Sequence, residues 1–223
     1  METRYYDRAQ AGCVLASMLT MYANRRDVLV LALPRGGVPV AYEVAKALHV
    51  PLDVFLVRKL GVPGHEELAM GAIATGGVRV INEEVVRTLY ISPNVLDAVA
   101  FREERELERR ERLYRDDRPL PVVHDQTVIL IDDGLATGAT MRAAVRALRV
   151  QEPAAIVIAI PVAAYSTYRQ FRTEVDEIIC AQTPEVFYGV GWWYEDFSQT
   201  SDQQVRELLS LSAEENPAFT SRR

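Results

Sequence analysis

The chain lacks the features that mark several large classes of protein. It has only two cysteines, Cys13 and Cys180, among 223 residues, so we expect the reduced packing residues of a cytoplasmic protein and no disulfide framework. No apolar run approaches the roughly 20 residues that span a membrane, and the first residues lack the apolar core of a signal peptide. The net charge of −6 argues against nucleic acid as a main partner.

Two nucleotide-binding motifs are missing as well. No segment reads G-x-x-x-x-G-K-[ST], the phosphate loop of P-loop NTPases, and no G-x-G-x-x-G follows a strand-like run, as a dinucleotide site requires. What the chain does have is 49% apolar residues, enough for a substantial core, and a length that suits one domain.

Strand-like and helix-like patterns alternate along the chain, which predicts an α/β fold with a largely parallel sheet. The predicted strands are 28–33, 52–58, 127–132, 155–160 and 177–181. The predicted helices are 8–22, 38–48, 139–150, 164–172 and 202–211. A hairpin is predicted from the two runs on either side of Thr75-Gly76, 70–74 and 77–81.

The segment from Val128 to Thr140 is the most informative. Four apolar residues, typical of a strand buried on both faces, precede Asp132 and Asp133, and ligands of open α/β sheets bind beyond the carboxyl ends of the strands. The turn that follows is rich in Gly, Thr and Ala and leads into a predicted helix, whose free N–H groups form a phosphate cradle. The Thr137 and Thr140 hydroxyls add donors. This pattern predicts a ligand with hydroxyls and a phosphate, such as a phosphorylated sugar.

Other interpretations of this segment stay open at this point. A buried strand that ends in two acids also occurs as the magnesium-binding strand of P-loop NTPases, although the phosphate-holding half of that machinery is missing here. Adjacent aspartates can also simply cap a surface turn. Because successive strand residues point to opposite faces, both carboxylates reach one ligand only if the chain curls at Asp133, which Gly134 permits.

Two further segments place basic residues after predicted strands. The run 28–33 is followed by Pro34-Arg35-Gly36-Gly37, where glycines allow close approach to an anion and Arg35 can pair with phosphate oxygens. An ordinary glycine-rich turn is the alternative. The run 52–57 ends in Arg58-Lys59, and the Gly and Pro residues up to Glu67 predict a mobile, positively charged loop. His65 in this loop is expected to be a surface residue.

The 128–140 segment resembles the phosphoribosyl-pyrophosphate (PRPP) binding motif of the type I phosphoribosyltransferases, in which a hydrophobic run and two acids precede a T-G-x-T loop. PRPP synthases carry a similar motif. The resemblance covers about residues 25–200. It implies a Rossmann-like parallel sheet of the type I phosphoribosyltransferase kind with a small hood formed by the terminal segments.

The resemblance also implies roles for individual residues. Asp132 and Asp133 are the catalytic pair, which holds the ribose 2- and 3-hydroxyls and stabilises the positive charge that grows at C1. The 5-phosphate would be wrapped by Ala136, Thr137, Gly138, Ala139 and Thr140. The pyrophosphate would be bound by Arg35, Gly36, Gly37, Arg58 and Lys59. We expect Mg²⁺ to be held mainly through PRPP with the two aspartates nearby.

Two loops of the family suggest further details. The pyrophosphate loop often contains a non-proline cis peptide, which we place at Arg35–Gly36, and the 58–67 loop would close as a lid that excludes water. On the acceptor side, Tyr188 matches an aromatic residue that stacks on the base, and Glu195 matches an acid near the base and metal. Ala136 and the stretch 180–182 lack the acid and lysine with which 6-oxopurine enzymes read their base.

The domain prediction is a single phosphoribosyltransferase domain with one insertion. Ser92 and Pro93 begin a charged helix of about 92–115, with ion pairs such as Glu106–Arg110 and Glu108–Arg112. We interpret it as a solvated helix with one buried edge. The alternatives are a dimer contact or a nucleic-acid-facing helix, and the balanced signs of its charges argue against the latter. The predicted boundaries are a domain at 1–215, a core at about 25–182, a hood from 1–24 and 183–211, and a disordered tail at 216–223.

The function expected from this resemblance is transfer of the phosphoribosyl group from PRPP to a nitrogenous acceptor, such as a nucleobase, with release of pyrophosphate. Mg²⁺ is the expected cofactor, nucleotide metabolism and nucleoside salvage the expected role, and a homodimer the expected assembly. A non-catalytic PRPP or nucleotide sensor of the same fold is the alternative. PRPP synthesis is a third possibility, and it would need a nucleotide site for ATP.

Overall fold

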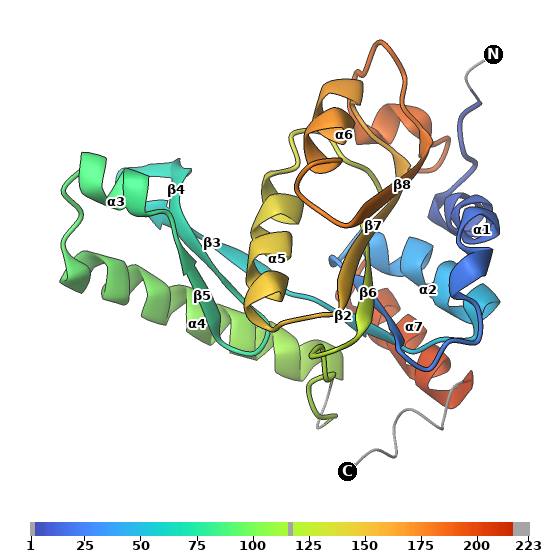
Figure 1. Ribbon diagram of the computed structural model, residues 1–223, viewed down its shortest axis with the longest axis horizontal. Helices are drawn as coiled ribbons and strands as arrows, with labels where there is room; N and C mark the ends of the chain where they lie inside the picture. Colours follow the sequence, from blue (N-terminus) through green and yellow to red (C-terminus); the bar gives the residue numbers. More distant parts are fainter. Residues whose placement is uncertain (1–2, 116–117, 216–223) are drawn as a thin grey trace.

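The computed structural model describes residues 3–115 and 118–215, so the predicted tail 216–223 lies outside the described residues. Figure 1 shows two parts: a core around one twisted sheet, and an arm that projects from it and carries a second, smaller sheet. None of the helices in the described ranges is both long and apolar enough to cross a membrane.

The central sheet is parallel throughout and has the order β2-β1-β6-β7-β8. Its strands are β1 (Val28–Ala32), β2 (Leu52–Val54), β6 (Thr127–Ile131), β7 (Ala155–Val162) and β8 (Glu177–Gln182). Every residue of β1 and β6 is buried, because helices cover both faces of these central strands. The predicted α/β class and parallel sheet are confirmed.

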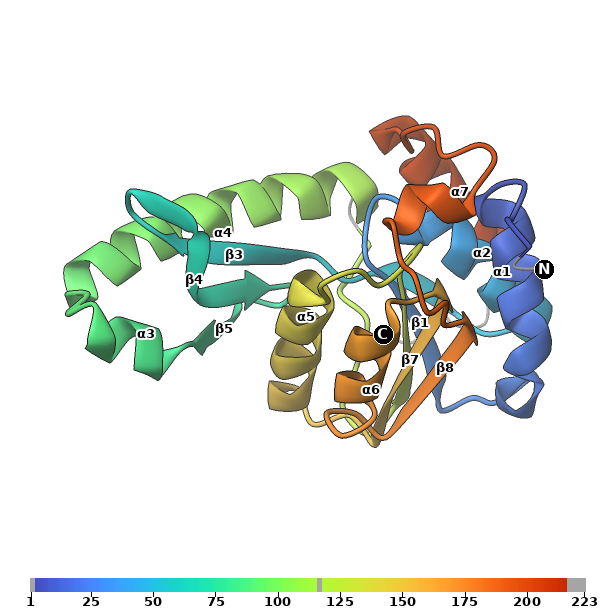
Figure 2. The same cartoon turned by 90° about the horizontal axis from the view of Figure 1, so that it is seen from above.

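The helices form two layers on this sheet (Figure 2). One layer contains α1 (Arg8–Met18), α2 (Gly37–Leu48) and α7 (Asp202–Glu215); the other contains α5 (Ala139–Val150) and α6 (Tyr165–Phe171). Val28 and Val30 of β1 pack in the first layer, and Leu29 and Leu31 pack in the second. This alternation follows from the pleat of the strand.

The strand order places a crevice between β1 and β6. The chain runs from β1 to β2 on one side and from β6 to β7 on the other, so the connections diverge at this pair. Ligands of open α/β sheets bind at such a switch point, beyond the carboxyl ends of the strands. The turns 33–37 and 132–139 both begin there.

The arm is an antiparallel sheet covered by a long helix. It consists of β3 (Val57–Val62), β4 (His65–Ala74), β5 (Val78–Ile81), the short helix α3 (Glu83–Thr88) and α4 (Pro93–Arg115). The predicted mobile lid loop is wrong in this respect, since Arg58 to Glu67 form a hairpin with a tight turn at Pro63-Gly64. Glycine suits this turn because its φ is +79°.

The predicted strand 52–58 is also two strands and not one. The chain leaves the central sheet at the buried residues Phe55 and Leu56, where the Leu56 N–H donates to Thr75 Oγ1 at 2.9 Å. Val57 then pairs with Ala74 in the arm. The sequence does not reveal this break, because the apolar residues on both sides of it are buried. In the same way, the predicted helix 8–22 ends at Met18 and continues as a 3₁₀ turn, Thr20–Tyr22.

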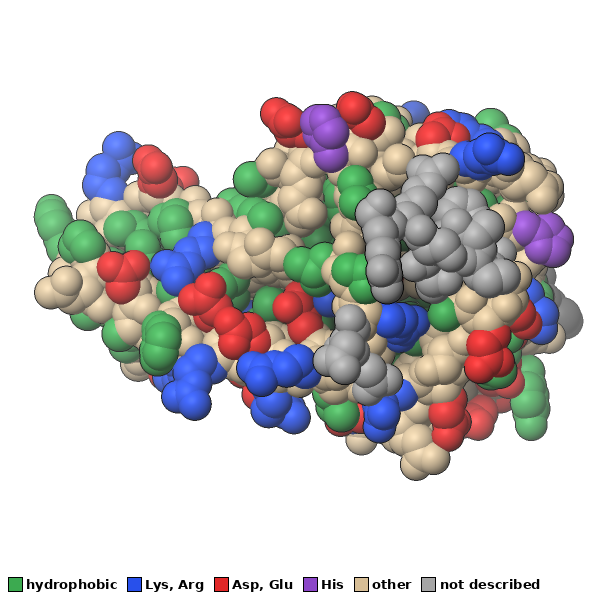
Figure 3. All heavy atoms as spheres, turned by 90° about the horizontal axis from the view of Figure 1, so that it is seen from below, with side chains coloured by type: hydrophobic (Ala, Val, Ile, Leu, Met, Phe, Trp, Pro, Cys, Tyr) green, Lys and Arg blue, Asp and Glu red, His purple; other side chains and the backbone are tan. Residues whose placement is uncertain are grey.

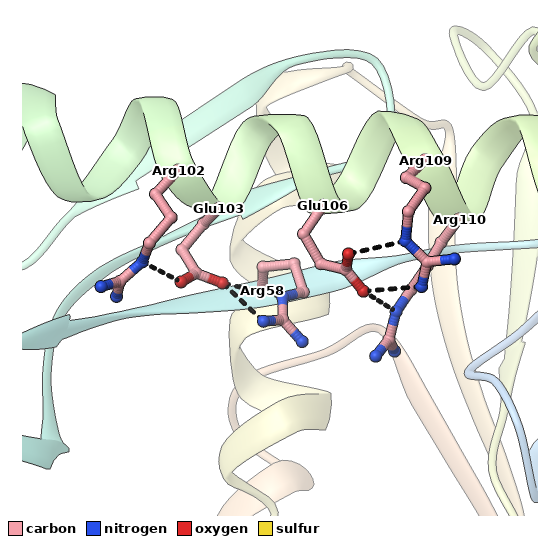
Figure 4. Close-up of polar contacts among 6 residues, drawn as sticks. All are labelled: Arg58, Arg102, Glu103, Glu106, Arg109 and Arg110. Carbon is pink, nitrogen blue, oxygen red and sulfur yellow. Dashed lines mark hydrogen bonds and ion pairs between the residues drawn. The ribbon is translucent and has the colours of Figure 1, made fainter.

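The charged helix α4 buries one edge, against the arm sheet and α7. Its buried edge includes Val99, Ala100, Leu107 and Tyr114. Figure 4 shows part of its polar side, where Arg110 Nε lies 2.8 Å from Glu106 Oε1 as the sequence predicts. The predicted pair Glu108–Arg112 also forms, at 3.5 Å.

The terminal segments meet beside the carboxyl end of the central sheet. Tyr5 forms a β-bridge with Tyr194, and both residues belong to a small apolar cluster with Ala11, Val162 and Trp193. The 3₁₀ turn η2 (Val190–Trp193) leads into this cluster. In contrast, most of α1 and α7 pack on α2 in the main helical layer, so only parts of the terminal segments cover this end.

Candidate functional site

Two turns touch at the ends of β1 and β6. At Gly37, a Cβ would lie 2.7 Å from the Ile131 carbonyl oxygen, and at Gly36 a Cβ would lie 2.1 Å from Asp133 Oδ2. A side chain at Gly37 would therefore push the two turns apart, and one at Gly36 would displace the Asp133 carboxylate. The two glycines thus bring the predicted pyrophosphate turn into direct contact with the acidic pair.

The acidic pair is held by a local and a distant contact. The Asp133 N–H donates to Asp132 Oδ1 at 2.8 Å, which is the curl of the chain expected there. Asp133 Oδ2 accepts from Arg8 of α1, with Nη2 at 2.8 Å and Nε at 2.9 Å. The Tyr194 hydroxyl donates to the Asp133 carbonyl oxygen. Gly134 also packs closely against Val190, since a Cβ on Gly134 would lie 2.5 Å from Val190 Cγ1.

The two carboxyl groups of the acidic pair are partly buried, and burial changes their pKa values. Burial, with the neighbouring charge of Asp133, raises the pKa of Asp132 well above its ordinary value. Burial also raises the pKa of Asp133, although Arg8 acts in the opposite direction. Carboxyl groups perturbed in this way at the switch point of an α/β sheet are typical of a functional site, because a ligand's hydroxyl donors or a cation would stabilise the ionised form.

The turn after the acidic pair is open to solvent. Ala136, Thr137, Ala139 and Thr140 are all exposed. Gly138 caps α5 with a φ of +73° and offers no side-chain oxygen to the first N–H groups of the helix. Those groups have no partner inside the helix, and the helix dipole adds positive potential there. The turn can therefore accept an anion.

Neighbouring elements fix the shape of this turn. Thr167 Oγ1 donates to the Ala136 carbonyl oxygen at 2.6 Å. A Cβ on Gly138 would lie 2.6 Å from Phe171 Cε2. Both contacts come from α6, so this helix supports the turn from behind and leaves its N–H groups free to face a ligand.

The turn after β1 contains the cis peptide, at Pro34–Arg35. The prediction of Arg35–Gly36 is therefore wrong by one residue. The Gly37 N–H donates to the Leu33 carbonyl oxygen at 3.1 Å, so the tight bend is closed around Pro34 and Arg35. The Arg35 side chain is about one-third exposed, and its Nη1 lies 3.8 Å from Asp202 Oδ1 of α7.

Arg58 and Lys59 point to opposite sides of the arm, as neighbours on a strand do. Arg58 donates to Glu103 Oε2 of α4, with Nη2 at 2.6 Å and Nε at 2.9 Å (Figure 4). Lys59 instead lines a cavity of about 230 Å³ between the arm and α5, which also includes Ala139 of the open turn. Of the two predicted pyrophosphate residues, the structure brings Lys59 toward the turn and Arg58 to α4.

The predicted acceptor residues lie on the segment next to the acidic pair. Tyr188 is 72% exposed, and its ring centroid is 5.2 Å from that of Trp192. Glu195 is exposed, and its N–H donates to the Tyr5 carbonyl oxygen at 2.8 Å. Val190 connects this segment to Gly134 as described above. The aromatic pair is therefore available to a planar ligand beside the site.

Sequence reasoning missed three residues of this site. Arg8 and Tyr194 contact Asp133, and Trp192 pairs with Tyr188. Arg8 lies 125 positions from Asp133 in the chain, and no local pattern indicates the contact. The aromatic content of 187–197 was the one available signal for Tyr194 and Trp192.

The donor set suits a divalent cation that a ligand shares. Within residues 3–115 and 118–215, no group of three or more His, Cys, Asp or Glu side chains could hold a metal by itself. Asp132 and Asp133 supply carboxylate oxygens, the ligand type that Mg²⁺ prefers, and Mg²⁺ commonly takes its remaining ligands from substrate phosphates and water.

Comparison with known proteins assigns the chain to a family. The phosphoribosyl transferase domain matches residues 3–195. Two Mycobacterium tuberculosis proteins, from strains H37Rv and CDC 1551 / Oshkosh, bear the name "Putative phosphoribosyl transferase" and are each 44% identical to this chain over 203 residues. The match covers 91% of this chain and 46% of each relative, so the chain spans about half the length of these curated relatives.

Solved structures agree with the fold. TT1426 from Thermus thermophilus is 38% identical and superimposes with a TM-score of 0.83 over 93% of this chain and 98% of that chain. The AQ2163 protein from Aquifex aeolicus is 12% identical, with a TM-score of 0.51 over 91% and 85% of the two chains, which supports the fold alone. The family match agrees with the acidic pair and the open turn at the β1–β6 crevice. The chain therefore belongs to the phosphoribosyl transferase domain family and has the type I fold that its motif predicts.

Proposed function

We propose that the protein transfers the phosphoribosyl group from PRPP to a nitrogenous acceptor and releases pyrophosphate. The observation that supports this most is the pairing, at one end of the sheet, of two partly buried carboxylates with a helix N-terminus open to solvent. Carboxylates bind ribose hydroxyls, and the helix N-terminus binds the 5-phosphate. Residues 136–140 are the proposed phosphate turn.

The proposed leaving-group site is the turn after β1 with one residue of the arm. Arg35 is partly exposed, and Gly36 and Gly37 lie beside the acidic pair, with the Gly37 N–H bonded to the Leu33 carbonyl oxygen. Lys59 approaches from the arm across the cavity next to α5. Because Arg58 pairs with Glu103, we assign it to holding α4 on the arm, and we propose Lys59 as the residue that meets the pyrophosphate.

We propose that Mg²⁺ binds with PRPP near Asp132 and Asp133. When bound there, the cation would neutralise charge on the pyrophosphate and so make it a better leaving group. The two aspartates would orient the ribose and stabilise positive charge at C1. Acceptor deprotonation is assigned to no residue.

The acceptor is proposed to be a planar nitrogenous ring, such as a nucleobase. The exposed pair Tyr188–Trp192 offers aromatic faces beside the acidic pair, and ring stacking contributes about 0.5–1.5 kcal/mol beyond area burial. Glu195 is the proposed acidic contact near the ring. We place this reaction in cytoplasmic nucleotide salvage, which agrees with two free cysteines.

We also propose a homodimer formed through the arm. No residue of α3 is fully buried, although Val85 and Val86 pack against the apolar cluster of the arm. Leu89 and Tyr90 at the end of α3 are exposed, Tyr90 by 93%. Figure 3 shows hydrophobic side chains at the free end of the arm, with acidic and basic side chains interspersed along it. Exposed apolar residues that cluster at the end of a projection are typical of a contact surface.

The direct test is to mix the protein with Mg²⁺-PRPP and single nucleobases and to measure pyrophosphate. We expect release with one base or a small set of bases, and a loss of at least about a hundredfold in Asp132→Asn with Asp133→Asn. Asp125→Asn is the matched control, because Asp125 is exposed and remains outside the site. Tight PRPP binding without turnover would instead indicate the sensor. Full activity in the double variant would refute the assignment of the aspartates.

A further inference from the structure

Arg8 occupies a junction between three parts of the site. Its Nε and Nη2 both face Asp133 Oδ2, and its Nη1 donates to the Ser198 carbonyl oxygen at 2.7 Å. The guanidinium also lies over the Phe197 ring, with Cζ 4.0 Å from the centroid. A Cβ on Gly36 would come within 3.3 Å of Arg8 Nε, so the pyrophosphate turn touches the same side chain.

Each carboxyl group of the acidic pair has an oxygen that the protein holds. Asp132 Oδ1 accepts the Asp133 N–H, and Asp133 Oδ2 accepts from Arg8. The two carboxyl groups also contact each other, so the two adjacent hydroxyls of a ribose would meet them as a pair. Without Arg8, the Asp133 carboxylate could turn about its side-chain bonds and lose this arrangement.

The Arg8 side chain is itself held in place. It is only 11% exposed, and the Asp133 side chain is 15% exposed, so solvent screens the pair less than it screens a surface ion pair. The planar guanidinium combines a charged contact, a carbonyl contact and a ring contact, which an ammonium group cannot reproduce in one geometry. Arg8 can therefore couple the position of Asp133 to the segment 197–198.

We propose that Arg8 is a positioning residue for PRPP: it fixes the orientation in which the Asp133 carboxylate meets the ribose, and it links this carboxylate to the segment 197–198, which contacts the guanidinium. This inference rests on the proposed function, because it assumes that the aspartates bind the ribose of PRPP. Arg8 acts through Asp133 and touches no reacting atom.

The experiment measures binding of Mg²⁺-PRPP by calorimetry, which needs no knowledge of the acceptor. Wild-type protein binds PRPP, and we expect Arg8→Gln to weaken binding by about 10- to 100-fold, the range for loss of a charge-assisted contact. Arg8→Lys restores part of the affinity, since it keeps the charge on Asp133. Arg25→Gln is the matched control: it also breaks an Arg–Asp pair, with Asp27, and it leaves affinity unchanged.

A double variant separates positioning from general support of the fold. If Arg8 acts through Asp133, Arg8→Gln adds little to the loss already caused by Asp133→Asn, whereas independent effects would multiply. Multiplying losses, or wild-type affinity in Arg8→Gln, would overturn the proposal while the proposed function stands. Failure of the wild-type protein to bind PRPP would overturn the proposed function itself. Circular dichroism on each variant checks that it is folded.

Discussion

At the scale of single residues, Asp132 lowers the stability of the folded protein at neutral pH. The pKa of Asp132 is raised above that of the unfolded chain, so the folded protein holds a proton there more tightly. Stability from this group is therefore present at low pH and is lost as pH rises through the raised pKa. Ionising this buried carboxyl group costs stability, and a ligand that binds the ionised form would offset that cost.

Asp132→Asn should therefore stabilise the unliganded protein at pH 7 and abolish PRPP binding. A gain of about 1 kcal/mol corresponds to roughly 2–4 °C in a domain of this size, measured by thermal unfolding from pH 4 to pH 8. The gain should shrink toward pH 4, where the Asp132 carboxyl of the unfolded wild-type chain also becomes protonated. Asp27→Asn is the control of opposite sign, because Arg25 lowers the pKa of Asp27. A lower melting temperature in Asp132→Asn at pH 7 would contradict the prediction.

At the scale of elements, one ion pair joins the arm helix to the core. Arg115, at the end of α4, is 3% exposed, and its Nε lies 2.9 Å from Asp53 Oδ1 of β2. Arg115 also donates to the Val54 carbonyl oxygen. Burial raises the pKa of Asp53 in spite of this arginine, so the carboxylate depends on its partner to remain charged.

Arg115→Met should destabilise the protein by about 3–5 kcal/mol, because it leaves Asp53 buried without a cation. Adding Asp53→Asn should recover part of the loss. Arg112→Met on the same helix is the matched control: its pair with Glu108 is exposed, and we expect a change of about 0–1 kcal/mol. Urea unfolding followed by circular dichroism measures all of these. An equal loss of stability in Arg115→Met and Arg112→Met would contradict the prediction that the buried Arg115–Asp53 pair stabilises the fold more than an exposed pair does.

At the scale of the whole molecule, the arm extends the molecule beyond the core and exposes its end. Its sheet and α4 stabilise each other through Leu60, Met70, Leu107 and their neighbours, but α3 has no buried residue. A helix of this length has little intrinsic stability in water. A second copy that covers the arm end would add to the contacts that Val85 and Val86 make with the apolar cluster of the arm.

Leu89→Ser with Tyr90→Ser should convert the proposed dimer into a monomer. Light scattering after gel filtration measures the mass of the protein, with Leu211→Ser of α7 as the control, since Leu211 is a comparably exposed leucine on the core. We expect the control to keep the wild-type mass. A monomeric wild-type protein, or a double variant with unchanged mass, would exclude the arm end as the dimer contact.

How much of this could be predicted depends on sequence distance. The five parallel strands, the acidic pair and the open turn before α5 all follow from short runs: an apolar strand, two acids and a glycine-rich turn before a helix. The break between β2 and β3 and the hairpin at Arg58 to Glu67 did not follow, because a buried apolar run has the same pattern whether it is one strand or two.

The sequence alone determined the local chemistry, since Asp132, Asp133 and the turn up to Thr140 are neighbours in the chain and their backbone geometry is set by the residues between them. Only the tertiary structure decided where the basic side chains lie relative to this segment. It brought Arg8 to Asp133 across 125 positions, and it turned Arg58 to Glu103 and Lys59 toward α5. The physical reason is that a strand presents its side chains to two faces. The residues that each side chain contacts depend on how elements distant in the sequence pack against these faces.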